Sequence, residues 1–205
     1  MNAPLSNGQL TIHSTFLCGG TYATSSLLAL RIIERGEKVI PSIAVSSLQG
    51  RTVVLGSRQI PMIGDCLESL EKHFVRWAEK RDQYPKISFP FGNNLTFEIG
   101  GLISYSERST LSFKIIAQQG IFNLISVPVT ECFESGPEEL LEQFRKLKDW
   151  IVAAAKFGED AERNGKVNPD LIPASSNIYS DRGTTAHLVN VGGRGLSFTV
   201  AKCIF

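Results

Sequence analysis

The stretch NLTFEIGGLISYSERSTLSFKIIAQQGIFNLISVPV, residues 94–129, holds three β-rich runs that are separated by the short polar segments SERS and QQG. Within the first two runs every second residue is apolar, at Leu95, Phe97, Ile99, Leu111, Phe113 and Ile115. A period of two is typical of strands with one buried face, and short polar connections favour antiparallel pairing. We therefore expect an antiparallel meander over about 95–129, with Glu98 and Lys114 on a face that contacts water.

Further strands and helices are expected around this meander. The runs QLTIHSTFL, KVIPSIAV and RTVVLG are typical of strands, and Pro41 places the second of them at a sheet edge or a bulge. Apolar spacing and capping residues predict helices over 24–35, 65–80 and 137–157. Together these elements predict a single α+β domain: a mainly antiparallel sheet, built from the meander and from N- and C-terminal strands, with about three packing helices.

The composition changes after Gly158. Residues 159–187 are polar, contain two prolines and show no sustained period, so we expect an irregular segment over the surface. Residues 188–205 contain two strand-like pieces around a glycine-rich turn, which predicts a hairpin. We therefore divide the chain into an α+β core domain at 1–158, an irregular surface segment at 159–187, and a C-terminal hairpin at 188–205 that completes the same domain.

The charge balance and the cysteines narrow the functional classes. The 21 Lys and Arg residues nearly balance the 20 Asp and Glu residues, so the formal net charge of +1 provides no overall field for nucleic acid or an anionic membrane. Four cysteines are dispersed singly, without a C-x-x-C pair or a histidine at metal-ligand spacing, which favours a reducing, cytoplasmic location and no metal. No apolar run is long enough to span a membrane, and no motif indicates a cofactor.

A glycine turn follows the first predicted strand, in the stretch FLCGGTYATSSLLALRII. A helix beginning near 24 would direct free N–H groups and its positive dipole end toward an anion, so the candidate anion-binding residues are Gly19, Gly20, Thr21, Thr24 and Ser25. In an enzymatic interpretation Thr21 or Cys18 is the nucleophile, whereas in the alternative the glycines only form a turn and a hydroxyl caps the helix. Residues 19–21 resemble the Gly-Gly-Thr start of bacterial asparaginases, whose threonine is a nucleophile.

The stretch VNVGGRGLSF places one arginine between two strand-like runs. Backbone amides and a guanidinium in such a loop can contact a phosphate backbone, and the stretch is similar to the glycine-rich loop of ferredoxin-like RNA-binding proteins from CRISPR systems. The candidate nucleic-acid-binding residues are Arg194, Gly192, Gly193, Gly195, Arg51, Arg58, Arg76, Lys80, Arg81 and Lys86. Bases could stack on Tyr84, Phe89 and Phe91. The alternative for the glycine-rich stretch is a simple hairpin turn with a solvated arginine. The alternative for the aromatic residues is an apolar loop that packs below the meander.

These observations favour a non-catalytic binding or assembly module, with RNA or single-stranded nucleic acid as the most concrete ligand. A small cytoplasmic enzyme that uses the turn around Cys18 is one alternative, and a subunit that binds another protein or a second copy of itself is the other. The three histidines and the absence of a carboxylate pair at a recognisable spacing weaken the enzymatic alternative. Binding of nucleic acid is distinguished by its salt dependence, because phosphate contacts release counterions.

Overall fold

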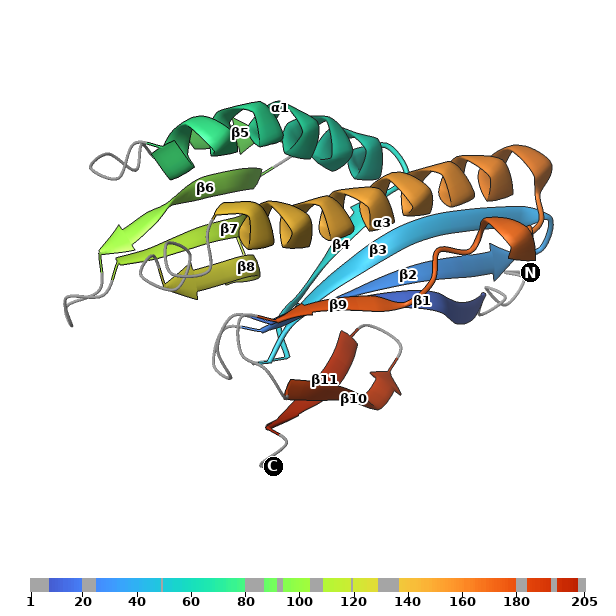
Figure 1. The fold of residues 1–205 in the computed structure, drawn as a ribbon. Helices are drawn as coiled ribbons and strands as arrows, with labels where there is room; N and C mark the ends of the chain where they lie inside the picture. Colours follow the sequence, from blue (N-terminus) through green and yellow to red (C-terminus); the bar gives the residue numbers. More distant parts are fainter. Residues whose placement is uncertain are drawn as a thin grey trace.

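The computed structural model describes residues 8–19, 25–48, 50–79, 87–91, 94–103, 109–118, 120–128, 137–179, 184–192 and 195–202. A five-stranded sheet has the order β4-β3-β2-β1-β9, and a four-stranded sheet has the order β5-β6-β7-β8. Two long helices, α1 and α3, lie over these sheets (Figure 1). The bounds of the first nine of these elements are β1 (Gln9–Gly19), β2 (Ser26–Arg35), β3 (Lys38–Ser47), β4 (Thr52–Gly56), α1 (Gln59–Glu79), β5 (Ile87–Pro90), β6 (Leu95–Ile103), β7 (Ser109–Ala117) and β8 (Gly120–Pro128).

The elements follow one order twice. Four antiparallel strands, β1 to β4, precede α1, and four further antiparallel strands, β5 to β8, precede α3 (Pro137–Asn164). Both sheets direct apolar side chains toward the helices, and one hydrophobic cluster contains residues of both sheets and both helices. Among the described residues there are therefore two units of the same element order around a shared core, although the sequence shows no internal repeat.

The predicted meander is confirmed as β6, β7 and β8. Phe97 pairs with Ile115 across β6 and β7, and both side chains are buried in the core, as the alternation predicts. The expected solvation of Glu98 and Lys114 is wrong, because both residues are buried and form an ion pair of 2.6 Å. Opposite charges at directly paired positions can satisfy each other. Charged residues on this face of the sheet can therefore be buried, although their types are typical of a solvated face.

The predicted helix over 24–35 is wrong, because Ser26–Arg35 forms strand β2, whose first seven residues are all buried. Leu28 and Leu30 contribute to the cluster under the helices, whereas Ala29 belongs to a small cluster on the opposite face. A strand covered on both faces carries a nearly continuous apolar run, which periodicity does not distinguish from a buried helix. Among the described residues there are therefore two α-helices instead of about three.

The other two predicted helices are confirmed with different ends. α1 begins at Gln59 instead of near 65, and Oε1 of Gln59 accepts a hydrogen bond of 2.8 Å from the backbone N–H of Gly56. α3 continues to Asn164, beyond the predicted end at 157. The side chain of Gln59 thus connects the start of α1 to the end of β4. The spacing of apolar residues along the helix does not predict this contact.

An ion-pair network joins α1 to α3. Glu71 of α1 accepts hydrogen bonds of 2.6 Å from Nζ of Lys148 and 2.8 Å from Nε of Arg145, both on α3. The hydrogen bonds from these two cations lower the pKa of the Glu71 carboxyl. Because the network is partly exposed, it contributes little stability.

α3 passes close to β3 at Gly158. A Cβ built on Gly158 would lie 3.2 Å from Cβ and 3.4 Å from Cγ of Pro41, which is closer than ordinary van der Waals contact. Glycine therefore suits this close approach. The prediction that Gly158 ends the helix is wrong, because α3 continues to Asn164. Pro41 is tolerated within β3 because β4 pairs with positions 42–46, so position 41 lies beyond the end of β4.

Replacing Gly158 with valine should reduce the free energy of unfolding by about 1–3 kcal/mol, because the added methyl groups overpack the contact with Pro41. The matched control is Gly64→Ala in α1, where a Cβ would meet Cγ2 of Val152 at an ordinary 3.6 Å. Since alanine favours helix more than glycine does, the free energy of unfolding of this control should be about 0.5–1 kcal/mol higher than that of wild type. Urea unfolding followed by circular dichroism measures both. A Gly158→Val protein as stable as wild type would contradict close packing here.

The segment 159–187 is more regular than its composition indicates. It includes the last residues of α3, the 3₁₀ turn η1 (Pro169–Leu171), strand β9 (Ser176–Tyr179) and the start of β10. β9 pairs in parallel with β1, with Leu17 opposite Asn177, and so adds a strand to the five-stranded sheet. The hydroxyl of Ser175 accepts a hydrogen bond of 3.1 Å from the backbone N–H of Thr15 at the start of this pairing.

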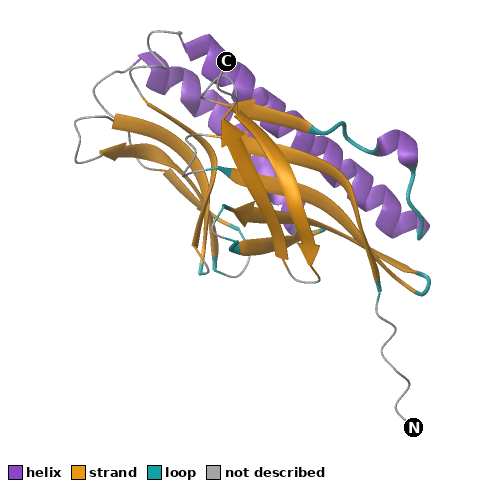
Figure 2. Ribbon diagram, turned by 90° about the horizontal axis from the view of Figure 1, so that it is seen from below, coloured by secondary structure: helices purple, strands orange, loops and turns teal. Residues whose placement is uncertain are grey.

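A C-terminal hairpin covers the face of the five-stranded sheet that points away from the helices, which we call the outer face. The hairpin itself is as predicted, with β10 (Thr184–Gly192) antiparallel to β11 (Gly195–Lys202), but it forms a separate two-stranded sheet. β11 contacts β3, and Figure 2 shows the hairpin crossing the sheet on the side away from the helices. The five-stranded sheet therefore has the helices on one face and the hairpin across part of the other, in agreement with the burial of β2 on both faces.

Candidate nucleic-acid interface

The two predicted arginines nearest β4 lie at opposite ends of that strand. Arg51 directly precedes β4, where its backbone carbonyl accepts a hydrogen bond of 2.9 Å from the N–H of Ser47 and closes the β3–β4 turn. Arg58 lies two residues after the strand, just before α1. Both arginines are exposed. Since the five residues of β4 span about 17 Å, the arginines present two cations separated by roughly that length.

Arg51 also contacts the second sheet. A Cβ built on Gly120, at the start of β8, would lie 3.1 Å from both Cδ and Nη1 of Arg51. The φ angle of Gly120 is +143°, a backbone conformation that residues other than glycine rarely adopt. Glycine thus leaves room for the arginine over the β7–β8 turn. The β3–β4 and β7–β8 turns, which lie far apart in the sequence, meet at this guanidinium.

β4 is an edge strand of the five-stranded sheet, paired on one side with β3. Val54, at its centre, is 47% exposed and lies on the outer face, because it pairs with Ala44. Thr52 contacts Ser46 on β3 through a hydroxyl–hydroxyl hydrogen bond of 2.8 Å. The β4 edge, defined as Arg51 to Arg58, therefore combines an exposed apolar centre with a cation at each end.

Among the remaining predicted basic residues, the structure describes Arg76, which lies away from this edge. Arg76 lies in the second half of α1, and at about 1.5 Å per residue it is roughly 25 Å along the helix from Gln59. Lys80, Arg81 and Lys86 lie outside the described residues. The predicted basic set is therefore not one continuous patch among the residues that are described.

The Gly/Arg loop has the geometry of a short hairpin turn at its two described glycines. Gly192 ends β10 and Gly195 begins β11, and the two pair with each other. Gly193 and Arg194 lie outside the described residues, so their predicted contact with phosphate stays a prediction. A two-residue connection is the commonest one between the strands of a hairpin, and glycine is favoured in it.

The aromatic residues predicted to stack on bases have another role. Phe91 is fully buried in the core, and Phe89 packs against the same hydrophobic cluster. Tyr84 lies outside the described residues. The alternative of an apolar loop below the meander is wrong, because Phe89 lies in strand β5, which pairs with β6 in the same sheet, and Phe91 directly follows that strand.

The turn after β1 loses the feature on which its anion-binding prediction depended. Gly19 is the last residue of β1, and Ser25 is buried directly before β2, so the expected helix N-terminus is replaced by a strand. Gly20, Thr21 and Thr24 lie outside the described residues. Without a helix, the dipole and free N–H groups that would hold an anion are missing from the described part of the turn.

Cys18 is unsuited to act as a nucleophile in this fold. Its side chain is fully buried in the main hydrophobic cluster, and burial raises the pKa of the thiol well above its usual range. A thiol in apolar surroundings stays protonated and unreactive. In the part of the chain that the structure covers, no group of three His, Cys, Asp or Glu residues is placed to hold a metal ion. The described helices also lack the length and apolar character needed to cross a membrane.

One polar pair on the outer face has no place among the sequence-predicted sites. Arg31 of β2 and Ser42 of β3 are directly paired, and they are only 6% and 4% exposed. Neither Nε of Arg31 nor Oγ of Ser42 has a hydrogen-bond partner. The signal that could have drawn attention to Arg31 is a single arginine inside the apolar run LLALRII.

Comparison of the chain with protein-family models, with curated proteins and with solved structures finds no match to any of them.

Proposed function

We propose that the chain is a non-catalytic binding module that holds RNA or single-stranded DNA along the β4 edge. The observation that carries the proposal is the placement of the exposed Arg51 and Arg58 at the two ends of one edge strand, with the exposed Val54 between them. Guanidinium groups bind phosphate oxygens in a bidentate manner, and an apolar centre can contact sugar or base. Two phosphates several nucleotides apart would meet the two arginines.

Local charge, and not the net charge, is the basis of this proposal. With a formal net charge of +1, the chain has no overall attraction to a polyanion, so affinity has to come from a few placed cations. Such binding is moderate and strongly salt-dependent. The dispersed cysteines fit a cytoplasmic location, where RNA is available.

Addition of a strand from a protein partner is the second candidate for the same edge. β4 has β3 on one side only, and exposed edge strands can pair with another chain. The two arginines would then protect the edge from such pairing instead of recruiting a ligand. We place nucleic acid first because charges at both ends of an edge oppose strand addition and attract phosphate.

The double variant Arg51→Ala/Arg58→Ala should bind oligonucleotides more weakly by at least tenfold. We also expect the dependence of log K on log salt to flatten by about 0.7 for each lost phosphate contact. Fluorescence anisotropy with labelled oligouridine and oligothymidine, at several salt concentrations, measures both quantities. The matched control is Arg163→Ala/Lys166→Ala, which removes the same charge from exposed positions at and beyond the end of α3.

Three results would contradict the proposal. Wild-type protein that binds neither oligonucleotide at low salt is not a nucleic-acid module. An equal loss in both double variants would show general electrostatics instead of an interface at β4. Full binding by the β4 variant would place the interface elsewhere.

A further inference from the structure

A row of four paired residues crosses the outer face at Arg31. Ile12 of β1, Arg31 of β2, Ser42 of β3 and Gly56 of β4 lie opposite one another in the sheet register. The next row on the same face contains Ala29 and Ala44, which are both fully buried. Arg31 is therefore surrounded within the sheet by small or apolar residues, and Ser42 provides the adjacent hydroxyl.

Arg31 lacks the partner that a buried guanidinium normally has. Its side chain is more than nine-tenths buried and its Nε has no hydrogen-bond partner. Burial alone lowers the pKa of Arg31, with no contribution from a nearby carboxylate. Keeping an unpaired charge out of water is costly, and arginines that are buried in proteins are usually paired. An anion beside Arg31 would remove this cost.

The row has unfilled space at its β4 end. Among the described residues, a Cβ built on Gly56 would meet only Oε1 of Gln59, at 3.9 Å, so these residues leave the space above Gly56 open. Ser42 lies between Gly56 and Arg31 in the row, and its Oγ has no partner. Arg58, two residues beyond Gly56, is exposed at this end of β4. A small anion that approaches across Gly56 would therefore meet Arg58 first, then Ser42, and finally Arg31.

The C-terminal hairpin lies on the same face of the sheet as the row (Figure 2). β11 contacts β3, and the hairpin shares no strand pairing with the sheet below it. Two-stranded hairpins have little stability of their own, so their position depends on packing. Because Ser42 and Arg31 are almost completely buried, an anion bound beside them would be largely shielded from water.

We propose that Arg31 and Ser42 form a phosphate-binding site on the outer face of the five-stranded sheet, reached from the side of Gly56. The guanidinium donates to two phosphate oxygens and the Ser42 hydroxyl donates to one, which satisfies the atoms that now lack partners. The phosphate belongs either to a nucleic acid that crosses the β4 edge or to a free phosphate compound. The first source rests on the proposed function, and the second does not.

Inorganic phosphate is the probe that tests the site without nucleic acid. Thermal unfolding of the full chain in phosphate, compared with chloride at equal ionic strength and pH, should show a Tm that rises by about 3–6 °C at tenfold excess over Kd. Titration followed by ³¹P NMR should show saturable binding. Arg31→Gln should abolish both effects, and Ser42→Ala should weaken binding several-fold.

Gly56→Leu provides a test that keeps the charge in place. Leucine at this position fills the open space at the β4 end of the row and should abolish phosphate binding, while the protein without phosphate unfolds as before. This variant remains informative if Arg31→Gln fails to fold. Arg163→Gln, on the exposed end of α3, is the charge-matched control and should bind phosphate like wild type.

The outcomes separate this site from the β4 interface. Phosphate binding that survives in Gly56→Leu, or wild-type protein that shows no saturable phosphate binding, overturns the site even if oligonucleotides bind. Saturable phosphate binding that Gly56→Leu abolishes supports the site. If oligonucleotides then fail to bind, the ligand is a free phosphate compound and the proposed nucleic-acid function is wrong.

Discussion

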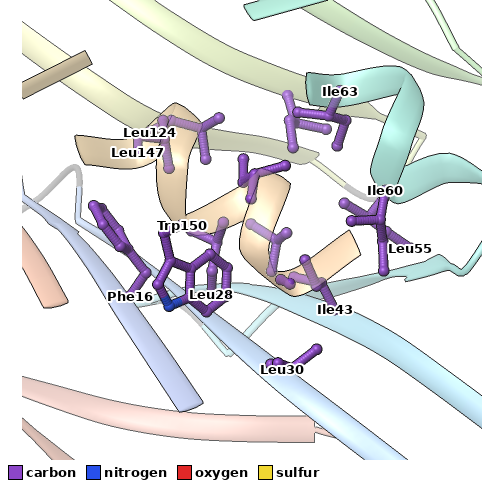
Figure 3. Close-up of a cluster of buried hydrophobic side chains, with 14 of the residues drawn as sticks. Phe16, Leu28, Leu30, Ile43, Leu55, Ile60, Ile63, Leu124, Leu147 and Trp150 are labelled. Carbon is purple, nitrogen blue, oxygen red and sulfur yellow. The ribbon is translucent and has the colours of Figure 1, made fainter. Parts of the chain in front are cut away.

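Trp150→Ala is expected to reduce the free energy of unfolding by about 3–5 kcal/mol, the range for removing a large buried aromatic side chain. Trp150 of α3 is only 4% exposed, and its ring contacts Phe16 of β1 with the centroids 5.6 Å apart. Its Nε1 donates a buried hydrogen bond of 3.0 Å to Oγ of Ser14. Figure 3 shows the indole between α3 and the strands, directed toward Phe16. One side chain thus attaches the long helix to the sheet.

A second substitution separates packing from hydrogen bonding at this position. Trp150→Phe keeps an aromatic ring but leaves the buried Ser14 hydroxyl without its donor, and should cost about 1–3 kcal/mol. In the background of Ser14→Ala, the same substitution should cost less, because no polar atom is then left unpaired. Urea unfolding measures all variants. If Trp150→Ala costs under about 1 kcal/mol, the contact between α3 and β1 is not a main source of stability.

Lys114→Met is expected to reduce the free energy of unfolding by about 3–5 kcal/mol, because it removes the cation from a buried ion pair. The two residues are paired across β6 and β7, with 2.6 Å between Nζ and Oε1, and both are almost completely excluded from solvent. Removing one member of a buried pair is costly because its desolvated partner remains. The free energy of unfolding, obtained from urea titration at neutral pH, measures this cost.

The chain contains a matched exposed pair as the control. Lys146 and Glu142, one turn apart on α3, form an ion pair of 2.9 Å in which both side chains are more than half exposed. Lys146→Met should change stability by no more than about 0.5 kcal/mol, because water replaces the lost contact. The double variant Glu98→Leu/Lys114→Met should regain part of the loss. Equal effects of Lys114→Met and Lys146→Met would contradict burial of the first pair.

Several elements were predictable because their burial follows a simple period. The meander β6 to β8 alternates apolar and polar residues, and the apolar face indeed packs under the helices. The helix in the second half of the chain carries its own capping signals, so its start at Pro137 was also predictable. In both cases the decisive information lies within neighbouring residues.

β2 and the Glu98–Lys114 pair show where local patterns fail. The apolar run of β2 indicates burial on all sides, but a helix and a doubly covered strand share that property. Whether the second face is covered depends on the hairpin beyond position 184, which crosses the sheet about 150 residues later in the chain. Likewise, Glu98 and Lys114 have the residue types of a solvated face, and only their direct pairing makes burial tolerable.

The candidate sites divide in the same way. Arginines and glycines in turns could be recognised in the sequence, and Arg51 and Arg58 are indeed exposed at turns. Their placement at the two ends of one edge strand is a property of the sheet order. Arg31 and Ser42 are eleven positions apart and become neighbours through strand pairing, and both are buried.

The sequence by itself therefore determined the strands of the meander, the two long helices and the identity of the exposed arginines, because residue spacing and polarity act within single elements. Tertiary structure alone decided which faces are covered, which charges become partners and where a buried guanidinium lacks one. These properties arise from contacts between segments distant in the chain, and no period within one segment contains them.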